Sequence, residues 1–349
     1  MSLEYADLVK LTQSTNNAER NAAEAKLQQA KDLNPGMFML IAAREVYNPE
    51  QTVHVRGTSA ALIKRTITYV PPGGTSVWVT LDNDTRKQIK DYILASLAAN
   101  EPAVRNLAAN LVAEILAIEL PLGEWRELIP QLAEKTSDTQ VEIKKSAIRT
   151  LGEIAAKLKF APNLLDNKMI ESILTGICLG LQPNEANNDI RVLSIKALHE
   201  SLAFLRVLLE KDDVFRYVIV GVLENCIFND REVRVSALRC LIDVCKHYYT
   251  MIANYVEPLW KATVDLLKSN DSEFAILAME VWNTIALIDR DRKLGVGAAG
   301  KSMAFGNEQN LNITTYVYKN LVIALMENLI VDNNFEKDDG ELSIGIASF

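Results

Sequence analysis

The sequence is poor in the residues that build disulfide frameworks, metal centres and hydrolytic sites. It holds only four cysteines and three histidines in 349 residues. The cysteines show neither disulfide nor zinc spacing and fall in apolar stripes of helical period, so we expect small core residues of a reducing compartment. The histidines lie far apart and lack the spacing of metal ligands. These residues are Cys178, Cys226, Cys240 and Cys245, with His54, His199 and His247. We expect no metal site, no cofactor and no local catalytic triad.

Long apolar runs, an N-terminal leader and an excess of positive charge are also lacking. No window reaches 18 uncharged apolar residues, which argues against a membrane span. The first residues show no basic region followed by an apolar run, so we expect no signal peptide. A net charge of −8 argues against a generic nucleic-acid binder and suits basic partners. The 49% hydrophobic content is that of a folded soluble protein.

The clearest positive feature is the stretch 229–241, which predicts the start of a helix. Asn229 or Asp230 can cap its first turn by accepting free backbone N–H bonds. An apolar stripe then follows at i, i+4, i+7 and i+8, the period of one helix face. The stripe consists of Val233, Ala237, Cys240 and Leu241. The small residue at its second position lets another helix approach closely.

The same pattern starts again at residues 55, 104, 143, 190 and 274, with a degenerate copy at 19. A period of about 40 residues is typical of a helical repeat array. Each unit of such an array contacts only its neighbours, so one linear core can run through a chain of this length. We therefore predict an all-α fold, an α-solenoid superhelix of about eight HEAT repeats.

Each stripe helix is preceded by a partner helix. The predicted helices are Leu3–Ser14, Ala18–Leu33, Gly36–Tyr47, Val55–Thr68, Asp84–Leu97, one from Pro102, Trp125–Lys135, Val141–Leu158, Asn167–Leu181, Asp189–Leu209, Val214–Phe228, Arg231–Tyr248, Tyr255–Lys268, Ser272–Ile288 and Asn312–Val331. Loops are predicted at 69–76, at 295–306 and, rich in acid, at 332–341. Because a solenoid normally ends in a polar cap and residues 342–349 are mostly apolar, we expect a piece of a longer chain. The alternative is a native C-terminus that folds back as its own cap.

Two segments carry a more specific resemblance. Residues 119–132, Glu-Leu-Pro-Leu-Gly-Glu-Trp-Arg-Glu-Leu-Ile-Pro-Gln-Leu, resemble a signature of importin β and its close relatives. Residues 78–90, Trp-Val-Thr-Leu-Asp-Asn-Asp-Thr-Arg-Lys-Gln-Ile-Lys, resemble the matching stretch of the third repeat. The resemblance covers the whole chain, which corresponds to less than half of a full-length importin β.

The resemblance implies a nuclear transport receptor and not an enzyme. Its implied partners are Ran in the GTP form, Phe-Gly nucleoporins, and importin α or a direct cargo, with no nucleic acid. Its implied location is the cytoplasm, the nucleus and the nuclear pore in the envelope. The implied organisation is a Ran-binding region in 1–140, a nucleoporin-binding region in 141–290, and a truncated eighth repeat with the acidic loop in 291–349.

Basic residues next to the stripes form a ladder whose expected role is structural, bridging to acids such as Glu101 and Asp230 at neighbouring helix starts. Some are nevertheless candidates for Ran contact, because the resemblance places Ran on the early stripe helices and against the acidic loop. The alternative for that loop is a solvated segment. The predicted Ran-binding residues are Lys64, Arg65, Arg105, Lys145, Asp332, Glu336, Asp338, Asp339 and Glu341.

The resemblance also implies that nucleoporin Phe side chains insert between outer helices, which are the partner helices that precede the stripe helices. The predicted groove, between the fifth and sixth outer helices, would capture one Phe ring weakly, at roughly 1.5–3 kcal/mol. Ordinary packing between repeats is the alternative. The predicted Phe-Gly residues are Leu174, Thr175, Cys178, Tyr217, Val218 and Gly221.

Two other functional classes remain as rivals. Residues 295–302 satisfy the P-loop pattern G-x-x-x-x-G-K-S, which would indicate an NTPase. A P-loop needs a strand before it and a helix after it, but a helix end precedes this one and a loop follows. The other rival is a HEAT scaffold subunit of a stable complex, as in phosphatase or vesicle-coat assemblies. It would show no nucleotide-dependent binding.

Overall fold

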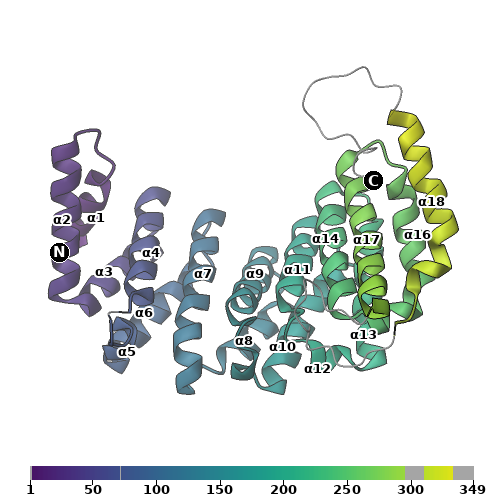
Figure 1. The fold of residues 1–349 in the computed structure, drawn as a ribbon. Coiled ribbons are helices and arrows are strands. Elements are labelled where there is room, and N and C mark those ends of the chain that lie inside the picture. Colours follow the sequence, from purple (N-terminus) through teal and green to yellow (C-terminus); the bar gives the residue numbers. More distant parts are fainter. Residues whose placement is uncertain (1, 71, 295–309, 333–349) are drawn as a thin grey trace. The chain divides into compact units, whose positions relative to one another are not determined.

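The computed structural model describes residues 2–70, 72–294 and 310–332, and in these ranges every regular element is a helix (Figure 1). The predicted all-α class is thereby confirmed. The described helices include none with both the length and the apolar character needed to cross a membrane.

The chain divides into two compact units, 1–176 and 177–349. The division falls within helix α10 (Asn167–Cys178), so it differs from the three functional regions expected from the resemblance. Those regions stay predictions, because a division by compactness does not test binding.

The first unit consists of helix pairs. Its main helices are α1 (Ser2–Leu11) with α2 (Asn17–Leu33), α3 (Pro35–Tyr47) with α4 (Val53–Thr68), α6 (Asn83–Ser96) with α7 (Pro102–Glu119), and α8 (Leu128–Lys135) with α9 (Val141–Leu158). Short helices α5 (Val77–Thr80), η1 (Leu120–Leu122) and η2 (Pro162–Leu164) lie in the links. The stripe helix α7 contacts both α4 and α9, and the outer helix α3 contacts α6. Successive pairs therefore stack in layers, as a repeat array requires.

The second unit continues the same arrangement. Its elements are η3 (Leu179–Leu181), α11 (Asn188–Ser201), α12 (Arg206–Leu209), α13 (Asp212–Cys226), α14 (Arg231–His247), α15 (Tyr249–Ile252), η4 (Ala253–Tyr255), α16 (Val256–Leu267), α17 (Ser272–Leu294) and α18 (Ile313–Asp332). Stripe helices α11, α14 and α17 contact one another in order, and outer helices α13, α16 and α18 do the same.

The predicted stripes form the core. In α14, Val233, Ala237 and Leu241 have no exposed surface, and Asp230 caps the helix by accepting from the Val233 N–H at 3.0 Å. The corresponding residues of α7 and α17, such as Ala108 and Ala278, are equally buried. The small second position lets α14 pack against helices on both sides. The prediction that the stripe residues form the core is therefore confirmed.

Contact between η3 and α11 is closer still and depends on glycine. A Cβ placed on Gly180 would clash with Oγ and Cβ of Ser194, a buried residue of the α11 stripe. The chain therefore accepts only glycine here without moving one of the two elements.

Several predicted boundaries were wrong. Helix α8 begins at Leu128, because Gly123 (φ 79°) and Trp125 (φ 58°) are left-handed and end any regular helix there. The predicted helix 189–209 breaks after Ser201 and resumes as α12. Helix α17 runs to Leu294, beyond its predicted end, and α5 was not predicted.

Two predicted features lie outside the described residues. The P-loop-like segment 295–302 is one, although the element directly before it is the helix α17 and not the strand a P-loop needs. The other is the greater part of the acidic loop, including Glu336, Asp338, Asp339 and Glu341. Asp332 is the last residue of α18, and its side chain is likewise not described.

Candidate functional site

The arginines of the basic ladder form hydrogen bonds within the helix pairs. Arg56, at the start of α4, is 2% exposed and donates from Nε to the Val46 carbonyl of α3 at 2.8 Å. Its Nη1 donates to Glu101 Oε2 at 2.7 Å, the bridge expected from the sequence. The arginine thus donates to a carbonyl that has no partner within the last turn of α3. Its ion pair with Glu101 links this helix pair to the next one.

The same role recurs in later pairs. Arg105 donates to the carbonyls of Ala99 and Asn100 at 2.7 and 2.8 Å and pairs with Glu142. Arg191 donates to the Pro183 and Glu185 carbonyls, both at 2.9 Å, and packs on the Phe228 ring. Arg234 donates to the Phe228 carbonyl at 2.9 Å. These arginines close the turn between the two helices of a pair.

Asp230 differs from the expected pattern. It accepts from the Asn188 amide at 2.9 Å and from its own helix start, and no ladder arginine or lysine of the described chain reaches it. An uncharged partner therefore replaces the expected ion pair at this position.

Lys64 and Lys145 belong to polar networks on the stripe helices of the first unit. Lys64 Nζ donates to Asn110 at 2.7 Å and lies 2.9 Å from Glu114 Oε1, which Lys157 approaches to 2.5 Å. Burial raises the pKa of Glu114, but the two lysines outweigh that effect and hold the pKa below its usual value. Lys145 lies 3.3 Å from Glu142 Oε1. Both lysines are thus held in place before any partner binds.

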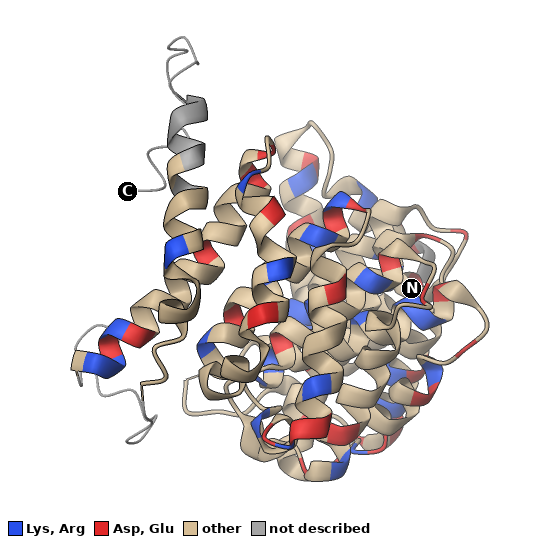
Figure 2. Ribbon diagram, turned by 90° about the vertical axis from the view of Figure 1, so that its right-hand side faces the viewer, with Lys and Arg blue, Asp and Glu red and all other residues tan. Residues whose placement is uncertain are grey.

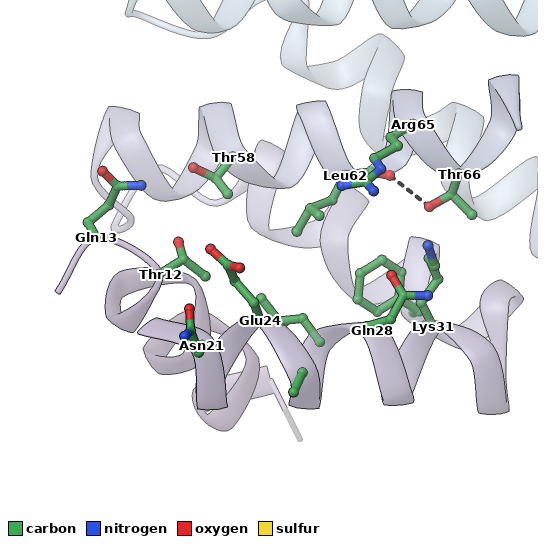
Figure 3. Close-up of a pocket in the computed structure, with 13 residues that line it drawn as sticks. Thr12, Gln13, Asn21, Glu24, Gln28, Lys31, Thr58, Leu62, Arg65 and Thr66 are labelled. Atoms are coloured by element: carbon green, nitrogen blue, oxygen red, sulfur yellow. Dashed lines mark hydrogen bonds between the residues drawn. The ribbon is translucent and has the colours of Figure 1, made fainter. Parts of the chain in front are cut away.

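The fourth predicted basic contact, Arg65, lines a groove between α2 and α4 with a volume of about 590 Å³ (Figure 3). Figure 3 shows Glu24, Gln28 and Lys31 of α2 facing Leu62, Arg65 and Thr66 of α4. The floor is apolar, formed by the buried side chains of Leu27 and Phe38. Two cations, a carboxylate and several amides and hydroxyls also line the groove.

Of the predicted Ran-binding residues, then, Arg65 is exposed in a groove, Lys64 is half-exposed in a network, and Arg105 is buried, with only 8% of its surface exposed. Sequence reasoning missed Lys31, Glu24 and Gln28. Their signal was available, because they repeat at i, i+4 and i+7 on the polar side of α2. Figure 2 shows Lys and Arg interspersed with Asp and Glu along the helices.

The predicted Phe-Gly residues are divided between the two units. In the first unit, Leu174 is buried and Thr175 exposed; in the second, Cys178, Val218 and Gly221 are buried while Tyr217 is 49% exposed. Partial burial raises the pKa of Tyr217, and the nearby Cys178 raises it further. Outer helix α13 also approaches η3 closely, since a Cβ on Gly221 would lie 3.3 Å from Leu181 Cβ. Tyr217 is the member of the second-unit set that offers side-chain surface to a partner.

The two segments that carry the family resemblance meet at one carboxylate. Trp78 Nε1 donates to Glu119 Oε1 at 3.0 Å, and Lys90 Nζ donates to Glu119 Oε2 at 2.8 Å. Arg86 lies 3.7 Å from the same group and 2.6 Å from Glu124, and Lys90 also lies over the Trp125 ring. The segments thus form one joint inside the first unit, and no partner is needed to explain them.

No cluster of metal-ligating side chains occurs among the described residues. The four cysteines are all buried, as expected. Burial raises the pKa of the Cys178 thiol to about 12, so this thiol does not ionise at neutral pH.

No family model matches the chain. Curated relatives do: it is 27% identical to Importin subunit beta-1 of Arabidopsis thaliana over 99% of this chain and 40% of that protein. It is 28% identical to Importin subunit beta-1 of Saccharomyces cerevisiae over 78% of this chain and 31% of that protein. The chain thus spans about two fifths of the first relative's length.

Solved structures match over the whole chain. A structure of Kap95p, whose binding induces the switch loops of RanGDP to adopt the GTP-bound conformation, matches with a TM-score of 0.88 at 24% identity. The Kap95:Nup1 complex matches with a TM-score of 0.85 at 24% identity. The match covers 100% of this chain and 40% or 41% of those chains. At this identity the likeness establishes the fold.

Proposed function

We propose that this chain, which belongs to the importin β family and matches that family's N-terminal portion, is part of a nuclear transport receptor. The observation that carries the proposal is the sequence relation to Importin subunit beta-1 over nearly the whole chain. The family is non-enzymatic, so the activity to be sought is binding. The proposed partners are Ran in its GTP form, Phe-Gly nucleoporins, and importin α or a direct cargo. The proposed setting is the cytoplasm, the nucleus and the nuclear pore.

For Ran, the proposed contact surface is the groove between α2 and α4 together with Lys64. Arg65 and Lys31 offer charged groups to solvent there, whereas Arg105 is committed to the carbonyls of its own helix pair. The apolar floor at Leu27 and Phe38 offers a surface against which an apolar side chain of the partner can pack. Lys145 and the acidic residues Asp332, Glu336, Asp338, Asp339 and Glu341 belong to the same proposal, carried by the resemblance alone.

The test of this surface is charge reversal in the groove. Arg65→Glu and Lys31→Glu should each weaken capture of GTP-loaded Ran at least tenfold, because each places a carboxylate where a cation is proposed to meet the partner. Lys26→Glu is the matched control, since Lys26 is an exposed residue of α2 outside the groove. Equal capture by all three variants and the unchanged chain would refute this surface.

For nucleoporins, the proposed contact is the outer face of α13 at Tyr217. Tyr217→Ala should reduce retention on an immobilised Phe-Gly repeat, because it removes the exposed ring against which a Phe side chain would pack. Tyr316→Ala on α18 is the control, because Tyr316 is also an exposed tyrosine of the second unit. Retention that falls equally in both variants, or in neither, would reject Tyr217 as the contact.

A further inference from the structure

The start of α18 is capped by a residue of another helix. Asp289 of α17 is 7% exposed, and its Oδ2 accepts from the Thr314 N–H at 2.8 Å and from Thr314 Oγ1 at 2.6 Å. Its Oδ1 accepts from the Ile313 N–H at 3.2 Å and from the hydroxyl of buried Tyr249. A helix start leaves its first N–H groups free, and a carboxylate there satisfies them. Asp289 therefore performs for α18 the task that a residue of α18's own chain segment usually performs.

The segment before α18 is tied to the same place. The Asn310 amide donates to the Asp289 carbonyl at 2.9 Å, and the Leu311 N–H donates to the Tyr249 hydroxyl at 3.1 Å. Arg292 of α17 lies 4.2 Å from the centre of the Tyr249 ring. Helix α17, Tyr249 and the start of α18 thus form one closed set of contacts around Asp289.

The residue that should cap α18 locally is present but turned away. Asn312 directly precedes the helix, and asparagine is among the best N-cap residues, which normally have an extended backbone. Here Asn312 has φ 49°, in the left-handed region. Its exposed side chain makes no hydrogen bond within the described chain, although its carbonyl accepts from the Thr315 N–H at 3.0 Å. The local cap is therefore unused, and Asn312 keeps a left-handed backbone, which asparagine adopts more readily than most other non-glycine residues.

We propose that the start of α18 is a hinge with two alternative caps. In the docked arrangement, Asp289 caps α18 and Asn312 stays left-handed. In the released arrangement, Asn312 turns to an extended φ and its side chain accepts from Thr314 or Thr315, so that α18 separates from α17 without unwinding. The exchange replaces one cap by another and relieves the left-handed backbone, which offsets part of the cost of breaking the contacts around Asp289.

The hinge stands independently of the proposed function, since it needs no bound partner. Its effect is to let the outer helix α18 move against α17 as a rigid element. A helix array that shifts one helix without unfolding it can change its surface at low cost.

The test combines two variants with two measurements. Nitroxide labels on Glu280→Cys of α17 and Lys319→Cys of α18 report the separation of the helices; both sites are exposed, and the native cysteines are buried and do not compete for label. Amide hydrogen exchange of residues 313–324 reports whether α18 stays helical. Asp289→Ala removes the cap from α17, and Asn312→Gly removes the local cap while accepting the left-handed backbone.

Asp289→Ala should add a population with a longer label distance while the α18 amides stay protected. In the double variant, Asp289→Ala with Asn312→Gly, the amides at the start of α18 should exchange at least tenfold faster, because neither cap remains. An unchanged distance in Asp289→Ala, or loss of protection as large as in the double variant, would overturn the hinge.

Asn312→Gly alone serves if Asp289→Ala does not fold. It should slow exchange of the Ile313 and Thr314 amides by about threefold, because the docked arrangement no longer carries the left-handed strain and has lost its competitor. Faster or unchanged exchange would contradict the proposal.

Discussion

The indole nitrogen of Trp78 donates to Glu119 Oε1 at 3.0 Å, and neither residue has exposed surface. The two residues are 41 positions apart, and the bond joins the two segments that carry the family resemblance. The carboxylate is also bound by Lys90 and lies near Arg86, so its charge is compensated inside the unit. A buried charge in such a set is costly to leave without its partners.

Lys90→Met should therefore destabilise the first unit by about 3 kcal/mol, because it leaves the Glu119 carboxylate short of its nearest cation. Urea unfolding followed by circular dichroism measures this change. Lys261→Met is the control, because it removes an ion pair of similar length, with Glu257 at 2.7 Å, that is exposed to solvent. A midpoint lowered equally by both variants would show that burial of Glu119 has no special role.

The close approach at Gly180 gives a second prediction. Gly180→Ala should destabilise the second unit by about 1–3 kcal/mol, because the added methyl group meets Ser194 of α11. Gly57→Ala is the matched control in the interior of α4, where the new Cβ would lie 3.5 Å from Leu107 in ordinary contact. There the substitution should be neutral or stabilising by up to about 1 kcal/mol, since alanine favours the helix. The opposite order of the two melting temperatures would contradict the packing described here.

Acid stability should depend on Glu114. Its pKa in the folded chain is below the usual value of about 4.3 because Lys64 and Lys157 stabilise its charged form. A depressed pKa contributes stability that is present above the unfolded pKa and is lost as pH falls through the folded pKa. The unchanged chain should thus have a larger free energy of unfolding than Glu114→Gln at pH 6, and this difference should shrink below about pH 4.3. Urea titrations at several pH values measure it, and a constant advantage down to pH 3 would rule out this linkage.

The sequence alone predicted the repeat architecture, because the stripe is a local periodic signal. Val233, Ala237 and Leu241 could be recognised from their spacing, and their burial follows from it. The boundary at Trp125 could not be predicted, because the left-handed turn there is stabilised by contacts with Lys90 from another helix. Tertiary contacts of this kind leave no trace in a sequence window.

The candidate site residues, too, could be predicted only in part from the sequence. Basic residues next to the stripes were visible in the sequence, but the structure alone separates Arg105, bound to the carbonyls of its own turn, from Arg65, exposed in a groove. Arg105 lies at the start of its stripe helix, within reach of the carbonyls that end the preceding helix, whereas Arg65 lies near the end of α4. The local sequence marks both as basic, but only the folded pair shows which one reaches a helix end.

One titration tests most directly whether this chain is the Ran-responsive transport receptor proposed above. The intact chain is titrated with Ran loaded with a non-hydrolysable GTP analogue and, separately, with GDP, at one fixed salt concentration. If the proposal is correct, binding will be at least tenfold tighter for the GTP form. Equal affinity for both forms, or no binding to either, would contradict it and favour a scaffold subunit with a constant partner.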